Sequence, residues 1–162
     1  MTAREQLAHA KRLAKEAHAG QADRGGHPYV EHLSAVASWC ESDVEKTVAW
    51  LHDILEDTSV DRKRLLEEGF SEEVVTAVEL LTKRYYPGFD YREYLENIRR
   101  NPLACKVKLC DLRHNMDTSR LKSITEKDII YQEKYRISRD YLNGTLEEGY
   151  EFPQVWSRHV EG

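Results

Sequence analysis

The sequence predicts a single all-α domain. Apolar residues recur at helical spacing in nearly every segment of the 162-residue chain, and residues typical of helix starts and stops separate these segments. No segment combines alternating apolar and polar residues with turn residues on both sides, so we expect no β-strand. With 40% hydrophobic residues and only 8 Gly and 4 Pro, the chain can bury a core and is not expected to be disordered.

The first half of the chain is expected to hold five helices. Gly20 and Gly69 are natural stops for the first and the fourth of them. Ser42 and Glu45 form a capping box that opens the third, which is expected to continue without a break through the ionisable residues at its end. A loop with two glycines and a proline occupies residues 21–29. The expected helical ranges are 7–17, 30–39, 42–57, 61–68 and 71–81.

The second half predicts three more helices, over residues 91–99, 102–112 and 126–143. Pro102 suits the first turn of a helix, and Gly144 is a favourable stop. We assign residues 1–144 to one domain of about seven to eight helices and residues 145–162 to a C-terminal tail, which either packs back as a short cap or frays.

Charge and cysteine content argue against several classes of protein. The net charge of −5 gives no general field for nucleic acid, and no apolar run approaches the roughly 20 residues of a membrane span. The N-terminus lacks the apolar stretch of a secretory signal. Cys40, Cys105 and Cys110 are an odd number without a CxxC pair, so neither a disulfide framework nor a thiolate zinc site is expected. A reducing cytoplasm is the expected location; the sequence sets no oligomeric state.

Ionisable residues gather at the end of the third expected helix. His52, Asp53, Glu56 and Asp57 fall within six residues that follow an apolar stretch. Spacings of four place His52 with Glu56 and Asp53 with Asp57 on two adjacent faces. A solvated helix end would explain an acidic pair alone, whereas a histidine beside core residues needs a partner or a cation.

A second cluster surrounds Asp111, which lies within an apolar helical pattern. Burying an unpaired carboxylate costs several kcal/mol, so Asp111 needs a cation or a metal. Lys108 and Asn115 share its face by spacings of three and four. His32 lies on an otherwise apolar helix, and taken alone it is more typical of a core histidine than of a metal ligand.

The chain carries a histidine (His32), then a His-Asp pair (52–53), then an aspartate (Asp111). This order resembles that of the HD-domain metal-dependent phosphohydrolases, and the resemblance implies an HD-domain helical bundle. The match to the hydrolase half of the RelA/SpoT alarmone enzymes is closer and covers roughly residues 5–143. With no length left for a synthetase domain, the chain most resembles a stand-alone small alarmone hydrolase. The matching stretches are AHAGQ (17–21), PYVEH (28–32), LHDILEDT (51–58), NPLA (101–104) and VKLCDLRHNM (107–116).

The resemblance implies one divalent metal ion, with Mn²⁺ favoured by the family and compatible with a mixed nitrogen and oxygen ligand set. Further histidines, such as His27 and His114, do not fall at the motif positions of a second ion. Glu56 and Asp57 match the acidic pair that positions or deprotonates the attacking water. The ligands that the resemblance implies are His32, His52, Asp53 and Asp111.

The resemblance also implies contacts to a small-molecule nucleotide. Asn115 matches a residue that contacts the nucleotide sugar, and Lys108 and Arg24 are the nearest cations for phosphate oxygens. Two acids, Asp23 and Asp117, depart from the family pattern at positions where it has basic residues. We therefore expect a divergent subgroup with a rearranged nucleotide site.

Arg120, which follows the second departure, is available to that rearranged site. The expected reaction is hydrolysis of the 3′-pyrophosphate of (p)ppGpp by a metal-activated water. Two alternatives stay open: the same mechanism on another nucleotide or small phosphorylated metabolite, and a non-catalytic nucleotide sensor. The aromatic residues within 85–94 either stack a base or anchor a loop by packing, and Tyr131 and Tyr135 are expected to lie mostly in the core.

Overall fold

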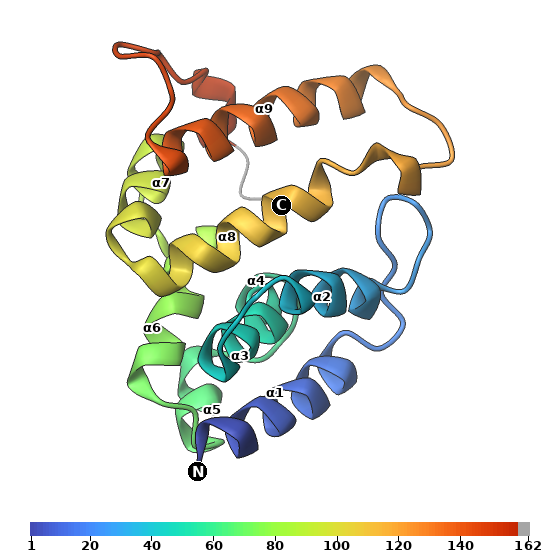
Figure 1. Cartoon of the computed structure of the whole chain (residues 1–162), viewed down its shortest axis with the longest axis vertical. Helices are drawn as coiled ribbons and strands as arrows, with labels where there is room; N and C mark the ends of the chain where they lie inside the picture. Colours follow the sequence, from blue (N-terminus) through green and yellow to red (C-terminus); the bar gives the residue numbers. More distant parts are fainter. Residues whose placement is uncertain (159–162) are drawn as a thin grey trace.

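Helices account for all the regular structure in the part of the chain that the structure describes, residues 1–158 of this computed structural model (Figure 1). The only β-type pairing among these residues is an isolated bridge between Ala22 and Pro28. The predicted all-α class is confirmed. The α-helices are α1 (Ala3–Ala17), α2 (Tyr29–Ser38), α3 (Asp43–Leu51), α4 (Ile54–Asp57), α5 (Arg62–Glu67), α6 (Glu72–Leu80), α7 (Tyr91–Arg100), α8 (Pro102–Asn115) and α9 (Glu126–Asn143), and the 3₁₀ helices are η1 (Lys83–Tyr85), η2 (Thr118–Arg120) and η3 (Gln154–Ser157).

Side-chain caps set most of the helix starts where the sequence predicts them. The capping box of Ser42 and Glu45 is present at α3, and Ser71 and Asp90 cap α6 and α7. Gly144 ends α9 in the left-handed conformation, at φ 75°. All eight expected helices are therefore found, but the one expected over residues 42–57 is divided into two helices, α3 and α4.

The third expected helix is broken in two, contrary to the prediction of one continuous helix. α3 ends at Leu51, and a new helical turn starts from Asp53, whose carbonyl accepts the backbone N–H groups of Glu56 and Asp57. In a regular helix, consecutive side chains point about 100° apart. The break instead brings His52 and Asp53 together, with His52 Nε2 3.0 Å from Asp53 Oδ2.

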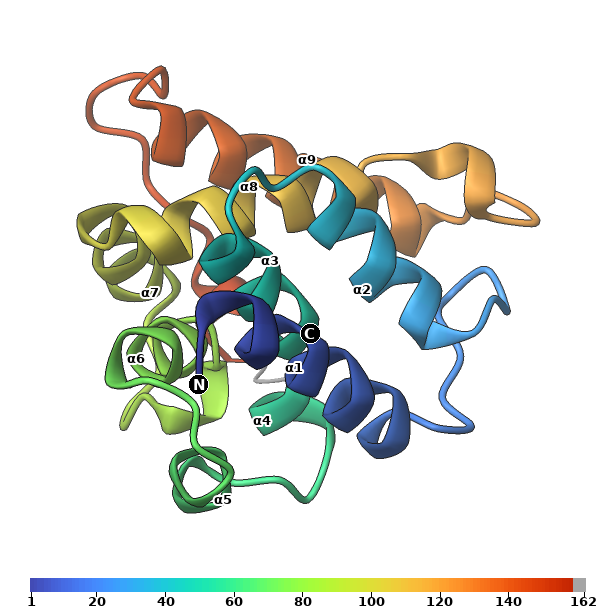
Figure 2. The same ribbon diagram turned by 60° about the horizontal axis from the view of Figure 1, so that its bottom comes forward.

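α3 forms the centre of the molecule and packs against α1, α2, α6 and α8. Figure 2 shows α2 and α8 running beside it. Its inward residues Val48 and Leu51 and the α4 residues Ile54 and Leu55 are fully buried. This apolar burial is the main stabilising contribution to the fold and fixes the ends of α2, α3 and α8 relative to one another.

α9 packs on α8 and α7, and the chain beyond it returns to α7. Of the two outcomes left open for the tail, packing is the one observed in its described part. The Trp156 ring lies 5.7 Å from the ring of Tyr91, and Ser157 Oγ accepts the Tyr91 backbone N–H at 2.9 Å. The last four residues of the predicted tail, 159–162, lie outside the described residues.

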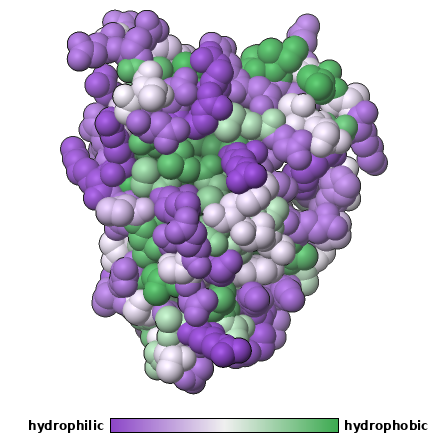
Figure 3. Space-filling model, in the orientation of Figure 1, coloured by the Kyte–Doolittle hydropathy of each residue, from purple (hydrophilic) through white to green (hydrophobic). Residues whose placement is uncertain are grey.

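The surface in Figure 3 is hydrophilic around its edges, with apolar side chains gathered in the middle of the face and near the start of α9. Near that helix start, Ile124, Ile129 and Ile130 are each more than half exposed. Within residues 1–158, none of the helices combines the length and apolar character needed to span a bilayer.

Candidate metal centre and cavity

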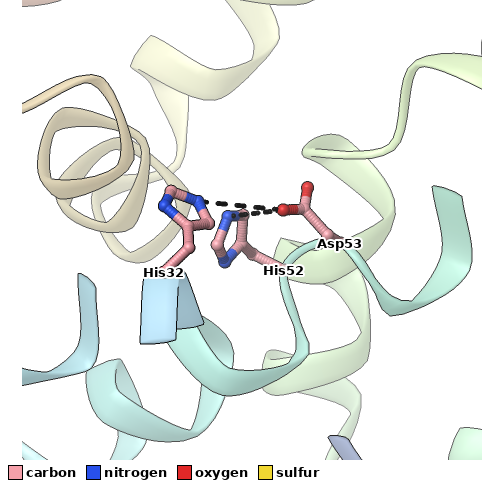
Figure 4. Close-up of side chains that lie close together, drawn as sticks. All are labelled: His32, His52 and Asp53. Carbon is pink, nitrogen blue, oxygen red and sulfur yellow. Dashed lines mark ion pairs between the residues drawn. The ribbon is translucent and has the colours of Figure 1, made fainter. Parts of the chain in front are cut away.

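Two imidazoles and one carboxylate meet where α2, α3 and α4 come together (Figure 4). One potential ligand atom from each of His32, His52 and Asp53 lies within 4.8 Å of the others. His32 Nε2 is 3.9 Å from Asp53 Oδ2, the same oxygen that His52 approaches. Both histidines are buried, whereas the Asp53 side chain is 22% exposed and lines a cavity.

α8 adds Asp111 to this cluster. Its Oδ1 lies 2.9 Å from His32 Nε2 and 3.3 Å from His52 Nε2. Lys108 Nζ donates to the other carboxylate oxygen at 3.1 Å, and the Asn115 amide donates to Oδ1 at 3.2 Å. The structure thus brings all four predicted metal ligands together and pairs the buried carboxylate as its burial requires.

The hydrogen bonds of His52 prepare one nitrogen for a cation. Its Nδ1 lies 2.6 Å from the Ala49 carbonyl oxygen, so Nδ1 carries the proton in the neutral ring and Nε2 holds the lone pair. That buried Nε2 has no hydrogen-bond partner among residues 1–158, although carboxylate oxygens of Asp53 and Asp111 lie nearby. A lone pair facing two carboxylates fits a divalent cation between them.

The electrostatics of His52 lead to the same conclusion. Burial alone lowers the pKa of this imidazole, but the negative charges of the nearby Asp53 and Asp111 carboxylates outweigh it and raise the pKa well above the usual range. The cluster therefore attracts positive charge strongly, either as a proton on His52 or as a metal ion in its place.

Two residues that sequence analysis left without a role support the cluster. The Tyr29 hydroxyl donates to Asp53 Oδ2, and His114 Nδ1 lies 2.6 Å from His32 Nδ1. Burial, then the charge of His32, lowers the pKa of His114 to about 4, so His114 is neutral near pH 7. With a metal at His32 Nε2, His32 would donate from Nδ1 to His114, a contact that orients the ligand ring. Both residues fall within matched motifs, which is the signal that could have found them.

The two acids of the predicted pair, Glu56 and Asp57, lie in different environments. Glu56 accepts the backbone N–H groups of Lys83 at 2.9 Å and Arg84 at 3.3 Å, whereas the Asp57 carboxylate has no hydrogen bond within the described chain. Burial, then the charges of Asp53 and Glu56, raises the pKa of Asp57 to about 6. Glu56 thus anchors η1, and Asp57 remains available beside the metal cluster.

A cavity of about 300 Å³ opens from this cluster. Its size is at the lower end of the range for small-molecule sites. Acids form one part of the lining and lysines and tyrosines another. The charged and aromatic side chains that line it include Arg24, Tyr29, Asp53, Glu56, Asp57, Lys83, Tyr91, Tyr94, Lys108, Asp111, Arg120, Tyr131, Lys134 and Tyr135.

The two arginines predicted to contact the substrate, Arg24 at phosphate oxygens and Arg120 in the rearranged nucleotide site, are both paired with acids. Arg24 pairs with Asp128, and Arg120 pairs with Asp23. Asp23 also accepts the backbone N–H groups of Gly25 and His27 at 2.9 and 3.0 Å. Asp23, the first departure from the family pattern, is therefore stabilised by the Arg120 side chain and by two backbone N–H donors. The second, Asp117, caps η2 through Ser119.

Packing accounts for most of the aromatic cluster at residues 85–94. Tyr91 and Tyr94 are buried, and their rings pack against Phe89 and Tyr86. The expectation that Tyr131 and Tyr135 lie mostly in the core holds in part for Tyr135, which is partly buried against the core, and not for Tyr131. Both are half-buried on α9, stack on each other at 6.2 Å, and line the cavity.

Comparison with known proteins finds relatives but no matching family model. The guanosine-3′,5′-bis(diphosphate) 3′-pyrophosphohydrolase of Haemophilus influenzae is 36% identical over 119 residues, which cover 65% of this chain and 17% of that protein. The bifunctional (p)ppGpp synthase/hydrolase SpoT of Escherichia coli K12 is 34% identical over 119 residues, again 65% of this chain and 17% of the relative. The chain thus spans less than a fifth of the length of these curated relatives.

A solved structure of a metazoan ortholog of SpoT that hydrolyzes ppGpp shares the fold. It superposes with a TM-score of 0.69 at 20% sequence identity, over 87% of both chains. The resemblance of this chain to the HD-type RelA/SpoT hydrolases, predicted from its motifs, is thereby confirmed in sequence and in fold.

Proposed function

We propose that the protein is a metal-dependent phosphohydrolase that removes the 3′-pyrophosphate of (p)ppGpp. The observation that carries this proposal is the meeting of two imidazoles and two carboxylates from α2, α8 and the junction of α3 and α4, with Asp57 beside them. The names of the relatives supply the substrate. We also propose Mn²⁺ as the metal, a nucleotide as the small-molecule ligand, and the cytoplasm as the location.

His32, His52, Asp53 and Asp111 would hold the ion. When bound, a divalent metal lowers the pKa of its water and neutralises charge on phosphoryl oxygens. Asp57 accepts a proton from the attacking water, whose oxygen bonds to the 3′-linked phosphorus. The bond from that phosphorus to the 3′ oxygen breaks, the 3′ oxygen takes up a proton, and pyrophosphate leaves.

Asp57 suits the role of proton acceptor better than Glu56. Both carboxylate oxygens of Glu56 already accept backbone N–H groups from η1, which fixes the position of that segment. The pKa of Asp57, about 6, leaves it ionised at neutral pH and still basic enough to take a proton.

Metal removal and ligand substitution test the proposal. Treatment with a chelator should abolish hydrolysis of ppGpp, and Mn²⁺ should restore it. His52→Ala and Asp111→Asn should each lose bound metal, measured by elemental analysis, together with turnover. If His52→Ala kept both metal and turnover, the ligand assignment would be wrong; metal binding without turnover of any nucleotide in the wild type would favour the sensor.

A further inference from the structure

Three lysines from three separate elements converge on one part of the cavity wall. Lys83 comes from η1, Lys108 from α8 and Lys134 from α9, and all three line the cavity. Their ammonium groups lie over the same two rings. The Nζ of Lys134 is 4.6 Å from the ring centre of Tyr91, that of Lys108 is 5.6 Å from Tyr94, and that of Lys83 is 5.9 Å from both.

Only one of these lysines has an acid partner within ion-pair distance. Lys108 pairs with Asp111, whereas Lys83 and Lys134 form no ion pair within residues 1–158. Lys83 is only 8% exposed, and Lys134 is half-buried. An unpaired ammonium is costly to bury, and like charges nearby add to that cost.

The titration behaviour of the two unpaired lysines agrees with this geometry. Burial, then the charge of Lys108, lowers the pKa of Lys83 to about 8. Burial, then the charges of Lys83 and Lys108, lowers the pKa of Lys134 to about 7. No carboxylate is among the groups that shift the pKa of Lys134, so the Tyr91 ring rather than an acid stabilises its charge.

Within the described chain, the two arginines of the cavity, unlike Lys83 and Lys134, form ion pairs with aspartates. Arg24 and Arg120 each pair with an acid that also fixes the backbone around it: Asp128 caps α9, and Asp23 accepts two amides of its own loop. The charge of each arginine is therefore already compensated by a protein acid. Lys83 and Lys134 present charge without breaking any ion pair, and the compact ammonium of lysine is a common phosphate binder.

We propose that Lys83 and Lys134, with Lys108 beside them, form a phosphate-binding subsite that takes over the charge neutralisation expected of Arg24. The subsite adjoins the metal ligands through the Lys108–Asp111 pair, so it would hold a phosphoryl group of the substrate next to the one that faces the metal. This assignment rests on the proposed function for the identity of the substrate, but binding of an anion at the lysines does not require hydrolysis.

Titration of the metal-free protein with inorganic pyrophosphate tests the subsite directly. In the presence of EDTA, calorimetry should show binding that Lys134→Met and Lys83→Met each weaken about 10- to 100-fold. Lys134→Arg, which keeps the charge, should stay within a few-fold of wild type. The matched control is Lys127→Met, which removes an exposed lysine from the same helix and should leave the affinity unchanged.

Equal pyrophosphate affinity in wild type, Lys134→Met and Lys127→Met would overturn the subsite. The same variants are assayed with ppGpp and Mn²⁺, where Lys134→Met should raise KM about 10-fold without loss of bound metal. If the wild type hydrolyses ppGpp but Lys134→Met binds pyrophosphate as tightly as the wild type, the subsite is wrong and the proposed function stands. If Lys134 controls pyrophosphate binding but no ppGpp is cleaved, the subsite stands and the proposed function fails.

Discussion

At the scale of single residues, His52 shows how a ligand is prepared before any metal binds. Its backbone N–H and its ring Nδ1 both meet the Ala49 carbonyl oxygen, at 3.5 and 2.6 Å. These contacts hold the ring so that Nε2 faces Asp53 and Asp111. An imidazole fixed by its second nitrogen binds metal with little reorganisation.

The role of Asp57 as proton acceptor predicts how the rate depends on pH. Because its pKa is about 6, the carboxylate loses its ability to accept a proton as the pH falls below that value. The wild-type rate should therefore fall as the pH drops below about 6, and a bound metal, which offsets the charge of Asp53, would move this fall to a lower pH. Asp57→Asn should lower kcat about 10²- to 10⁴-fold and remove this acidic limb from the residual activity. The measurement is kcat against pH for both proteins at saturating Mn²⁺.

Glu56→Gln is the comparison for that experiment. Glutamine keeps an acceptor for one of the two backbone N–H groups of η1, so the variant should lose less kcat than Asp57→Asn. A larger loss in Glu56→Gln than in Asp57→Asn would reverse the assignment of the two acids.

The candidate metal ligands and Lys108 could be predicted from the sequence, whereas Lys83 and Lys134 could not, for a physical reason. The ligands are acids and histidines within apolar patterns, where burial forces a partner or a cation. Lys134 lies in a charged stretch and Lys83 precedes another basic residue, Arg84, and a lysine in such a position is ordinarily solvated. Their burial results from the packing of α7, α8 and α9, which no local pattern encodes.

At the scale of elements, the break between α3 and α4 decides the geometry of the site. Helix starts such as Ser42 and Ser71 were predictable because a short polar side chain that caps backbone N–H groups is a local signal. The break was not, because apolar residues at Leu51, Ile54 and Leu55 continue the helical spacing across it. It is stabilised by contacts from distant elements, such as the Tyr29 hydroxyl on Asp53.

The loop at residues 21–28 is the second element that matters, because it closes one side of the cavity. It packs tightly on η2: a Cβ added at Gly25 would collide with the Arg120 carbonyl oxygen. The Asp23–Arg120 pair joins the same two segments. The loop is therefore positioned by an ion pair and by close backbone contact, and its cations are directed toward protein acids.

Asp23→Arg tests this account of the loop. The family pattern alone would suggest better alarmone binding, but the change places two arginines together and removes the acceptor for two loop amides. We expect KM for ppGpp to rise several-fold and resistance to proteolysis in the loop to fall. Arg120→Asp added to Asp23→Arg should recover part of the loss. A gain in activity from Asp23→Arg alone would show that the pair does not organise the loop.

At the scale of the whole molecule, the site joins helices that lie far apart in sequence. His32 and Asp111 are 79 residues apart and in contact, and His52 comes from the central helix between them. Loss of any one helix contact would therefore affect the ligand set as well as the fold. A bound ion should in turn stabilise the folded protein, because the unfolded chain lacks the site.

The C-terminal segment belongs to this packing. Trp156 is 7% exposed and packs on the face of α7 that also carries Tyr91, the ring beneath the lysine subsite. Trp156→Ala should lower the free energy of unfolding by about 3 kcal/mol, as measured by urea denaturation. Val155→Ala, at a neighbouring residue that is 47% exposed, is the control and should change stability little. Equal stability of both variants would show that the segment does not pack on α7.

The proposed reaction is tested by identifying the products formed from ppGpp. The purified protein is incubated with ppGpp, with Mn²⁺ or with a chelator, and the nucleotide and phosphate products are separated. We predict GDP and pyrophosphate in equal amounts, only with metal, and none from His52→Ala. Release of inorganic phosphate alone, or no product at any metal concentration while ppGpp still binds, would contradict the account.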